Sequence, residues 1–534
     1  MKNLNIGLSF SGGGYRAATF DLGGLSFLNS LKVDEEQTLL DCVKALSSVS
    51  GGTITALKYM LARAKGQDVD KMVEELFSFL CNEDLVVRAM KGLSAEKANR
   101  DASSIKIMAG IYDEVLFKGA VMQDIIDNLD KIPVKDYTAL ATDFDNSLPF
   151  RFRITEGKMT SGERLTYGVF GNQKHRIGRD VAGRITLGEA LACSSCFPSG
   201  FEPMMYPKDF KVSQIKDFES YKPMRFGLMD GGIVDNQGID PIVLAEERMR
   251  KYREDKSRTD KALDLLIVSD VTSPYMNGYQ PSSQKLPQGI GKLTFGRLRN
   301  YGLIAEAVSI LLFIITLVLG NGFWIGLMTV VLTLITVANI VGALFKNKIF
   351  GLIAKTFVGN NATFISHLKF ATIESMLTNR AKSVIMMTSS VFLKRLRKMN
   401  YETLYNDDEW HNRTVTSTIY ELREGERWES RITNGTMPEY LAPSLEMQQN
   451  SKLATSMGTT LWFTAKDKEK GMPQAILADG QYTMCYNLLQ YIDDIQVDKE
   501  NLTDAHQHIM ALKPQLLEAW KKFLKNPQWM VPKC

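Results

Sequence analysis

The segment at residues 43–56, VKALSSVSGGTITA, places the tightest constraint on the fold of this chain. Its apolar first half predicts a short strand, and the residues from Gly51 onward predict a helix that begins directly after the strand. Ser50 would then lie at a sharp corner with its hydroxyl exposed. Ser48 and Gly52, two positions to either side, are small, as close passage of strand and helix requires. The N–H groups after Ser50 would belong to a helix N-terminus, which favours developing negative charge.

This stretch alone leaves two interpretations open. It fits a nucleophile elbow, the strand–turn–helix corner that presents a reactive serine. It also fits a plain Ser/Gly-rich turn that caps a helix, since Ser48 stands where the G-x-S-x-G pattern has its first glycine. Sequence features elsewhere in the chain distinguish these two interpretations.

A second glycine-rich turn follows the first predicted strand. Residues 4–10 form an apolar, alternating run, and Ser-Gly-Gly-Gly-Tyr-Arg at 11–16 leads into a helix that we expect to reach about residue 31. This order directs backbone N–H groups toward an anion. A simple turn and a dinucleotide fingerprint are the alternatives. Ala17 at the sixth position, and the lack of an acidic residue at the end of a clear second strand, argue against the fingerprint.

The third stretch is an apolar run at 224–229 that ends in Asp230-Gly231-Gly232. An aspartate at the carboxyl end of a strand, followed by two glycines, is exposed on a tight turn, although an ordinary Asp-Gly hairpin turn fits as well. Residues 263–271 predict a buried parallel strand. We therefore predict an α/β fold with a mostly parallel central sheet, whose sites gather at the carboxyl ends of its strands.

Acyl transfer needs an oxygen nucleophile, a base and N–H donors for the oxyanion. Ser50 would supply the nucleophile, and the amides of the 12–14 loop would supply the donors. None of the five histidines lies in a stretch that reads as a strand-end loop, so Asp230 becomes the expected base. Burial would raise its pKa from about 3.9 and make it a better base. Asp235 is the rival candidate for the same role.

The composition changes abruptly at residues 307–345, which contain no charged residue. The run divides at Gly320-Asn321-Gly322 into helices of ~26 Å (303–319) and ~34 Å (323–345) at 1.5 Å per residue. Both can cross a hydrocarbon core of ~30 Å. Basic residues flank the pair but not its turn, which predicts that both ends face the cytoplasm. A shallow hairpin in one leaflet and a soluble apolar helix pair are the alternatives.

The rest of the composition excludes several classes of function. A formal net charge of +4 over 534 residues is too small to indicate a nucleic-acid partner. Six cysteines form no disulfide framework in a chain of this length, and we interpret Cys193 and Cys196 as small buried residues. We expect no metal site and no cofactor. Free thiols and an N-terminus without a secretory signal indicate the reducing, cytosolic side.

The motifs SGGGYRA at 11–17, SVSGG at 48–52 and DGGIVDNQG at 230–238, in this order, resemble the patatin-like phospholipases, as does ACSSCFPSGFEP at 192–203. The resemblance covers about residues 4–273 and, more loosely, parts of 380–495. It implies a patatin-like three-layer fold and hydrolysis of lipid acyl esters by a Ser-Asp dyad. The implied site comprises Ser50 as nucleophile, Asp230 as general base, Gly12, Gly13 and Gly14 as oxyanion loop, and Arg16, Gly52, Gly231 and Gly232 in support.

These observations predict a catalytic core at 1–275, a linker at 276–302, a membrane hairpin at 303–345, and a part at 346–534 that completes the soluble domain. Within the last part we expect a strand at 382–391 and a helix at 473–491. The expected activity is that of a membrane-associated serine lipid acyl hydrolase. A lipid transacylase using the same dyad, a non-catalytic membrane scaffold and a nucleotide-binding protein are the alternatives.

Overall fold

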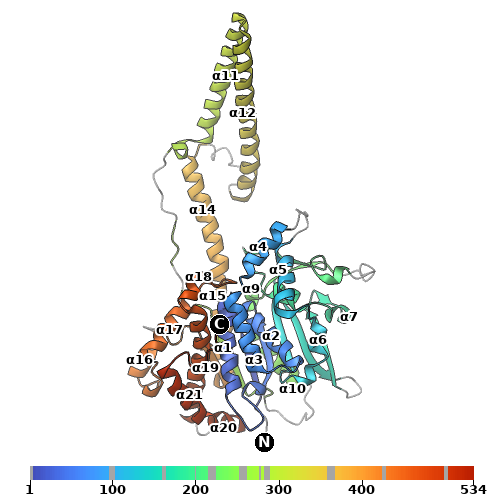
Figure 1. The fold of residues 1–534 in the computed structure, drawn as a ribbon, viewed down its shortest axis with the longest axis vertical. Helices are drawn as coiled ribbons and strands as arrows, with labels where there is room; N and C mark the ends of the chain where they lie inside the picture. Colours follow the sequence, from blue (N-terminus) through green and yellow to red (C-terminus); the bar gives the residue numbers. More distant parts are fainter. Residues whose placement is uncertain are drawn as a thin grey trace. The chain divides into compact units, whose positions relative to one another are not determined.

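A computed structural model describes residues 4–95, 103–158, 164–198, 200–214, 224–251, 261–275, 278–281, 289–357, 367–423, 428–497 and 503–534. The chain divides into two compact units (Figure 1). The larger unit contains residues 1–276 and 389–534, and the smaller contains residues 277–388. Two segments far apart in the sequence therefore build the larger unit together.

A mixed sheet forms the centre of the larger unit. Its strands are β1 (Ile6–Phe10), β2 (Val43–Val49), β3 (Asp136–Asp143), β4 (Leu148–Lys158), β5 (Arg164–Gly171), β6 (Arg176–Ile177), β7 (Met204–Tyr206), β8 (Phe226–Asp230), β9 (Leu265–Asp270) and β10 (Thr414–Thr418). They run in the order β10–β9–β1–β2–β3–β4–β5–β6, and β7 and β8 lie off this path. The strands from β10 to β3 are parallel, and β4 to β6 continue antiparallel. The predicted α/β class with a mostly parallel sheet is confirmed.

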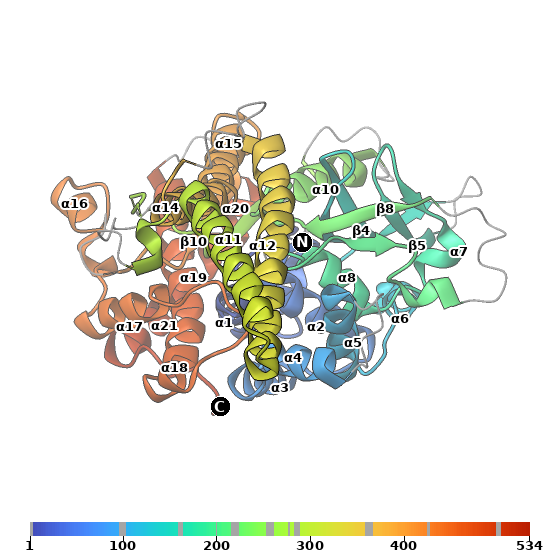
Figure 2. The same cartoon turned by 90° about the horizontal axis from the view of Figure 1, so that it is seen from above.

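Helices cover both faces of this sheet. They are α1 (Gly14–Ser30), α2 (Gly51–Ala64), α3 (Val69–Asn82), α4 (Leu85–Ala95), α5 (Ser104–Tyr112), α6 (Met122–Ile126), α7 (Arg179–Ala182), α8 (Leu187–Ser194), α9 (Gly232–Asp235), α10 (Ile239–Lys251), α15 (Leu393–Tyr405), α16 (Trp428–Thr433), α17 (Leu445–Thr455), α18 (Ala465–Glu469), α19 (Met472–Val497), α20 (Asp504–Ala511) and α21 (Lys513–Lys525). In Figure 2, α10 and α15 lie on one side of the strands, and α1, α2 and α8 lie on the other. The predicted helix at 473–491 corresponds to α19, which packs along α1.

The three-layer arrangement follows from residues that alternate along buried strands. In β9, Leu265 and Ile267 join the larger core, whereas Leu266 and Val268 face α10 on the opposite side. Successive side chains of a strand point to opposite faces, so a strand covered on both sides has to be apolar throughout. This explains why 263–271 is a continuous apolar run.

Strand β3 brings β2 and β8 together. Its pairing with β4 extends over the whole strand, so β2 and β8 share its other side. Leu140 of β3 pairs with Val49 at the end of β2, and the next residue, Ala141, pairs with Asp230 at the end of β8. However, β8 runs antiparallel to β3. Asp230 is therefore the last residue of a short antiparallel strand within the otherwise parallel half of the sheet.

The smaller unit contains α11 (Phe295–Leu319), α12 (Gly322–Phe357) and α14 (Phe370–Met386). Helices α11 and α12 pack side by side and connect through a turn at Gly320 (Figure 1). The segments 296–319 and 322–344 are long and apolar enough to cross a membrane, and almost none of their residues are buried within the protein. By length and composition alone, two such helices suggest membrane association.

Helices α11 and α12 also hold one another through polar groups. The carboxylate of Glu306 accepts hydrogen bonds from the Thr336 hydroxyl at 2.8 Å and the Asn339 amide at 2.9 Å. Asn339 also donates to the carbonyl oxygen of Gly302 at 3.1 Å. These contacts fix the register of the two helices.

Two further expectations are wrong. Residues 382–391 form the end of α14 and a π-helical turn (Met387–Phe392) instead of a strand, because the helix that begins at Phe370 continues through them. Cys81 and Cys534 form a disulfide, so two of the six cysteines are not free thiols. This removes one reason for placing the chain on the reducing side of a membrane. Cys193 and Cys196 are buried free thiols, as expected.

Candidate active site

Ser50 occupies the corner between β2 and α2. Its backbone has φ 50° and ψ −118°, which is unusual for a residue with a side chain. The glycine that follows is required here, because a Cβ on Gly51 would collide with the backbone of Gly14. Gly52 is similarly confined, with Phe10 and the Ser11 carbonyl about where its side chain would be. The strained corner therefore exists because the two positions after Ser50 carry no side chain.

Ser194, at the end of α8, holds this corner in place. Its hydroxyl accepts the N–H of Ser50 at 2.9 Å and donates to the carbonyl oxygen of Leu140 at 2.7 Å. The hydroxyl of Thr53 in α2 lies 2.9 Å from the hydroxyl oxygen of Ser194. Sequence reasoning missed this role, although the small-residue segment that contains Ser194 was noted.

The glycine loop lies against the corner. A Cβ on Gly12 would come 3.2 Å from the Cβ of Ser50, so these two residues are neighbours. The N–H of Gly12 donates to the carbonyl oxygen of Asn236 at 2.9 Å. By contrast, the N–H groups of Gly13 and Gly14 have no acceptor among the described residues. With φ values of 153° and 61°, both adopt backbone conformations that favour glycine.

Asp230 is 6% exposed and lies at the end of β8. Its backbone N–H donates to the Cys196 carbonyl at 2.9 Å, and its carbonyl oxygen accepts from the Thr142 hydroxyl at 2.7 Å. The side chain accepts the N–H of Gly232 at 2.7 Å. Burial raises the pKa of Asp230 to about 6, against hydrogen bonds from the Gly232 N–H and the Ser50 side chain, which lower it. A carboxyl group with this pKa is a useful base near neutral pH.

The two glycines after Asp230 are packed tightly. A Cβ on Gly231 would collide with the Leu140 carbonyl, and one on Gly232 would meet the side chain of Asn236 at 2.5 Å. The structure thus brings Ser50, the 12–14 loop and the 230–232 turn to one place.

Asp235 is also buried, and burial followed by the charge of Asp240 raises its pKa to about 7. Its carboxylate, however, is occupied by four donors. These are the N–H groups of Gln237 (3.2 Å), Gly238 (2.9 Å) and Asp240 (2.9 Å) and the side-chain amide of Asn400 (2.9 Å). Such a carboxylate organises a turn and has little capacity left to accept a proton from a nucleophile.

Arg16 of α1 is buried and donates to the carbonyl oxygen of Met457 at 2.6 Å. Burial lowers the pKa of this guanidinium, while the nearby Tyr420 and Asp270 raise it. Arg16 therefore connects the helix after the glycine loop to the C-terminal part of the same unit.

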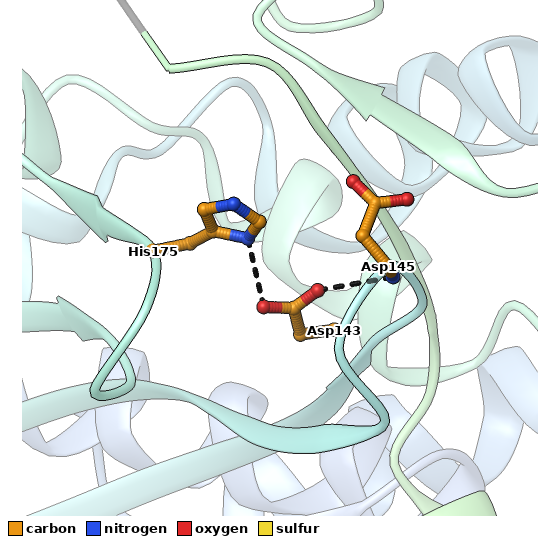
Figure 3. A group of neighbouring side chains, drawn as sticks. All are labelled: Asp143, Asp145 and His175. Atoms are coloured by element: carbon orange, nitrogen blue, oxygen red, sulfur yellow. Dashed lines mark hydrogen bonds and ion pairs between the residues drawn. The ribbon is translucent and has the colours of Figure 1, made fainter.

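Within the described residues, one group of side chains could hold a metal ion: Asp143, Asp145 and His175 (Figure 3). Asp143 already accepts hydrogen bonds from the amides of Asn146 and Asn172 and from the N–H of Asp145, and His175 Nδ1 lies 2.8 Å from it. Burial raises the pKa of Asp143, but these bonds and the histidine hold it below its usual range. The group therefore fits a fastening of the β3–β4 turn, in which hydrogen bonds already occupy both carboxylate oxygens of Asp143.

Comparisons with known proteins find one family and several solved structures that are similar to this chain. Residues 8–243 match the family described as "Patatin-like phospholipase". Among solved structures, human GIVD cytosolic phospholipase A2 aligns at 15% identity and a TM-score of 0.33, covering 50% of this chain and 43% of that chain. The same human enzyme in complex with methyl gamma-linolenyl fluorophosphonate and terbium chloride aligns at 17% identity and a TM-score of 0.27, covering 50% and 40%. The aligned part is less than half of those chains, and no curated protein matches.

Proposed function

We propose that this chain, whose residues 8–243 belong to the patatin-like phospholipase family, is a membrane-associated lipid acyl hydrolase with a Ser50–Asp230 dyad. One observation carries the proposal. Val49, the residue before Ser50, pairs with Leu140 of β3, and Asp230 pairs with the next residue of β3, Ala141. Consecutive residues of a strand are only ~3.3 Å apart. This spacing supports a contact between the Ser50 hydroxyl and the Asp230 carboxyl, as does the hydrogen bond from the Ser50 side chain that lowers the pKa of Asp230.

In the proposed reaction, Asp230 accepts the proton of Ser50 as its oxygen attacks the ester carbonyl of a lipid. The Gly13 and Gly14 N–H groups donate to the oxyanion, while Gly12 shapes the loop, since its own N–H is already bonded. The protonated Asp230 gives its proton to the leaving alcohol. Water, deprotonated by the same carboxylate, then releases the fatty acid from Ser50.

The free carboxylate distinguishes Asp230 from Asp235 as the base. Asp230 receives one backbone N–H, whereas Asp235 is held by four donors. A base has to present an unoccupied oxygen to the nucleophile. Residues 1–275 and the C-terminal part from 389 onward together build the catalytic unit in this proposal, and residues 303–345 anchor it to a bilayer with the catalytic unit facing the cytoplasm.

The test replaces Ser50 with Ala and Asp230 with Asn in separate full-length variants. Fatty-acid release from phospholipid vesicles should fall by several orders of magnitude in both, as in other nucleophile–base units. Ser456→Ala is the matched control, because among the described residues the hydroxyl of this exposed serine bonds only the nearby Leu453 carbonyl. Undiminished release in either dyad variant would exclude the dyad.

Two alternatives give different results in the same preparation. A transacylase would transfer the acyl group to an added lipid alcohol and lose this activity in the same two variants. A non-catalytic scaffold would not react with a fluorophosphonate probe at Ser50. Hydrolase and transacylase both act through the Ser50 hydroxyl, so the probe separates an enzyme from a scaffold directly.

A further inference from the structure

Helix α15 supports the candidate active site from the face of the sheet opposite to α1 and α2. It is the first helix of the larger unit after the chain returns from the smaller one at residue 389. Leu404, near its end, is buried in the same core as β9 and α10. The polar residues on its inner face reach two segments that carry the site.

The first connection runs from Asn400 to the turn after Asp230. The Asn400 amide donates to Asp235 at 2.9 Å, and the Asp235 carboxylate is almost fully buried. The other three donors to this carboxylate are backbone N–H groups of the turn itself, at residues 237, 238 and 240. Among the described residues, Asn400 is therefore the one donor to the Asp235 carboxylate that comes from another element.

The second connection runs to the glycine loop. Arg397 Nε lies 2.8 Å from Oδ2 of Asp270, and the Tyr401 hydroxyl donates to the same carboxylate oxygen at 3.0 Å. Asp270 is fully buried at the end of β9, and its other oxygen accepts the N–H of Thr272 at 2.8 Å. The Thr272 hydroxyl in turn accepts the side-chain amide of Asn236 at 2.8 Å.

Asn236 connects both routes. Its carbonyl oxygen accepts the N–H of Gly12, and its side-chain oxygen lies where a side chain on Gly12 or Gly232 would be. The glycine loop and the aspartate turn therefore touch the same asparagine. Its position is fixed from one side by Thr272 and from the other by the turn that Asp235 organises.

We propose that α15 is a clamp that positions the oxyanion loop relative to Asp230, and that Asn400 and Tyr401 are positioning residues for the reaction. The inference rests on the proposed function, because it assigns these residues to the same dyad and loop. Neither residue touches the reacting atoms. Each acts through a buried carboxylate, Asn400 through Asp235 and Tyr401 through Asp270.

The test uses Asn400→Leu, which keeps the size of the side chain and removes its donor, and Tyr401→Phe, which removes only a hydroxyl. The full-length protein is reacted with a fluorophosphonate probe, and its turnover of a short-chain p-nitrophenyl ester is measured. We expect Asn400→Leu to lower the labelling rate and kcat by ~10- to 100-fold, as misplacement of reacting groups by less than ~1 Å can do. KM should stay within about twofold of the wild-type value, because the ester-binding surface is unchanged.

Tyr401→Phe should lower both rates in the same direction by a smaller factor, and it keeps the proposal testable if Asn400→Leu does not fold. Thr403→Ala is the matched control on α15, since Thr403 is exposed and its hydroxyl bonds the Met399 carbonyl within the helix. Circular dichroism and thermal unfolding establish that each variant is folded at the assay temperature. A merely structural role would change the melting temperature and leave the labelling rate of the folded protein unchanged.

The outcomes separate the clamp from the dyad. The clamp would be overturned, and the dyad left intact, by one combination of results. In it, wild-type labelling is fast and is lost in Ser50→Ala, while labelling of folded Tyr401→Phe and Asn400→Leu is unchanged. Wild-type protein that is not labelled at Ser50 would overturn the proposed function itself. A raised KM with an unchanged kcat would also contradict the clamp, because it would place Asn400 in substrate binding.

Discussion

The backbone N–H of Ser50 donates to the hydroxyl of Ser194 at 2.9 Å, and this hydroxyl donates to the carbonyl oxygen of Leu140 at 2.7 Å. One hydroxyl thus ties the candidate nucleophile to the β3 residue that pairs with Val49. Ser50 has a positive φ, a conformation that persists only where its surroundings enforce it. The bond to Ser194 supplies part of that enforcement.

Replacement of Ser194 with Ala should therefore destabilise the protein and reduce its activity. The change leaves the Ser50 N–H and the Leu140 carbonyl buried without this partner, which costs about 1–3 kcal/mol for a buried group. The free energy of unfolding in urea measures the first effect and the fluorophosphonate labelling rate the second. Ser456→Ala should change neither, and an unaltered labelling rate in Ser194→Ala would show that the corner holds without this hydroxyl.

The pH dependence of activity should report Asp230. Burial raises its pKa to about 6, and a general base works only when it is deprotonated. We expect kcat/KM for a soluble ester to be constant above about pH 7 and to fall tenfold per pH unit below about 6. Asp479→Asn, which removes a different buried carboxyl, should keep this acidic limb. A profile that stays flat down to pH 5 would argue against Asp230 as the base.

Local patterns were sufficient to locate the three segments that meet at the site. The apolar runs before Gly12, Ser50 and Asp230 all form strands, because each lies in a buried sheet where apolar residues are required. The direction of β8 could not be found in this way. An apolar five-residue strand reads the same whether its neighbour is parallel or antiparallel, and only the tertiary pairing with β3 decides.

Long-range contacts explain the other omissions. Asn400 and Asp235 are separated by 165 positions, and no local pattern connects them. Cys81 and Cys534 are separated by 453 positions, so their spacing carries no signal of a disulfide. The run KSVIMMTSSV contains β-branched residues and looks like a strand, but it is the continuation of a helix whose earlier turns decide its conformation.

Asp479 of α19 gives a prediction about stability that is independent of catalysis. Its side chain is fully buried and accepts hydrogen bonds from Ser451 at 2.7 Å and Thr483 at 3.3 Å, while its second oxygen has no partner among the described residues. Burial raises its pKa from 3.8 to about 7, against these hydrogen bonds, which lower it. A carboxyl whose pKa is raised in the folded state stabilises the protein most below the unfolded pKa, and this contribution is lost as the pH rises to about 7.

The variant Asp479→Asn should remove that pH dependence. Between pH 4 and pH 8, the free energy of unfolding of the wild type should fall by roughly 3–4 kcal/mol more than that of the variant, at about 1.4 kcal/mol per pKa unit. Urea unfolding at the two pH values measures the difference, and Ser456→Ala provides a reference with the wild-type slope. Equal slopes for wild type and Asp479→Asn would mean that this carboxyl titrates normally.

The final prediction concerns α11 and α12, whose apolar side chains are mostly not covered by other parts of the protein. Residues 303–345 can be replaced by a flexible linker of about six residues, because Asn339 bonds the Gly302 carbonyl and the two ends are therefore near each other. We expect the full-length chain to remain with membranes after high-salt and carbonate washes, since each helix buries about 20 apolar residues in a bilayer. The deletion variant should move to the supernatant and hydrolyse a soluble ester within twofold of the wild-type rate.

Insertion of the same linker at the Gly320 turn, without a deletion, should leave the chain in the membrane fraction. Full-length protein in the supernatant would instead mean that these helices cover each other or a second copy of the chain.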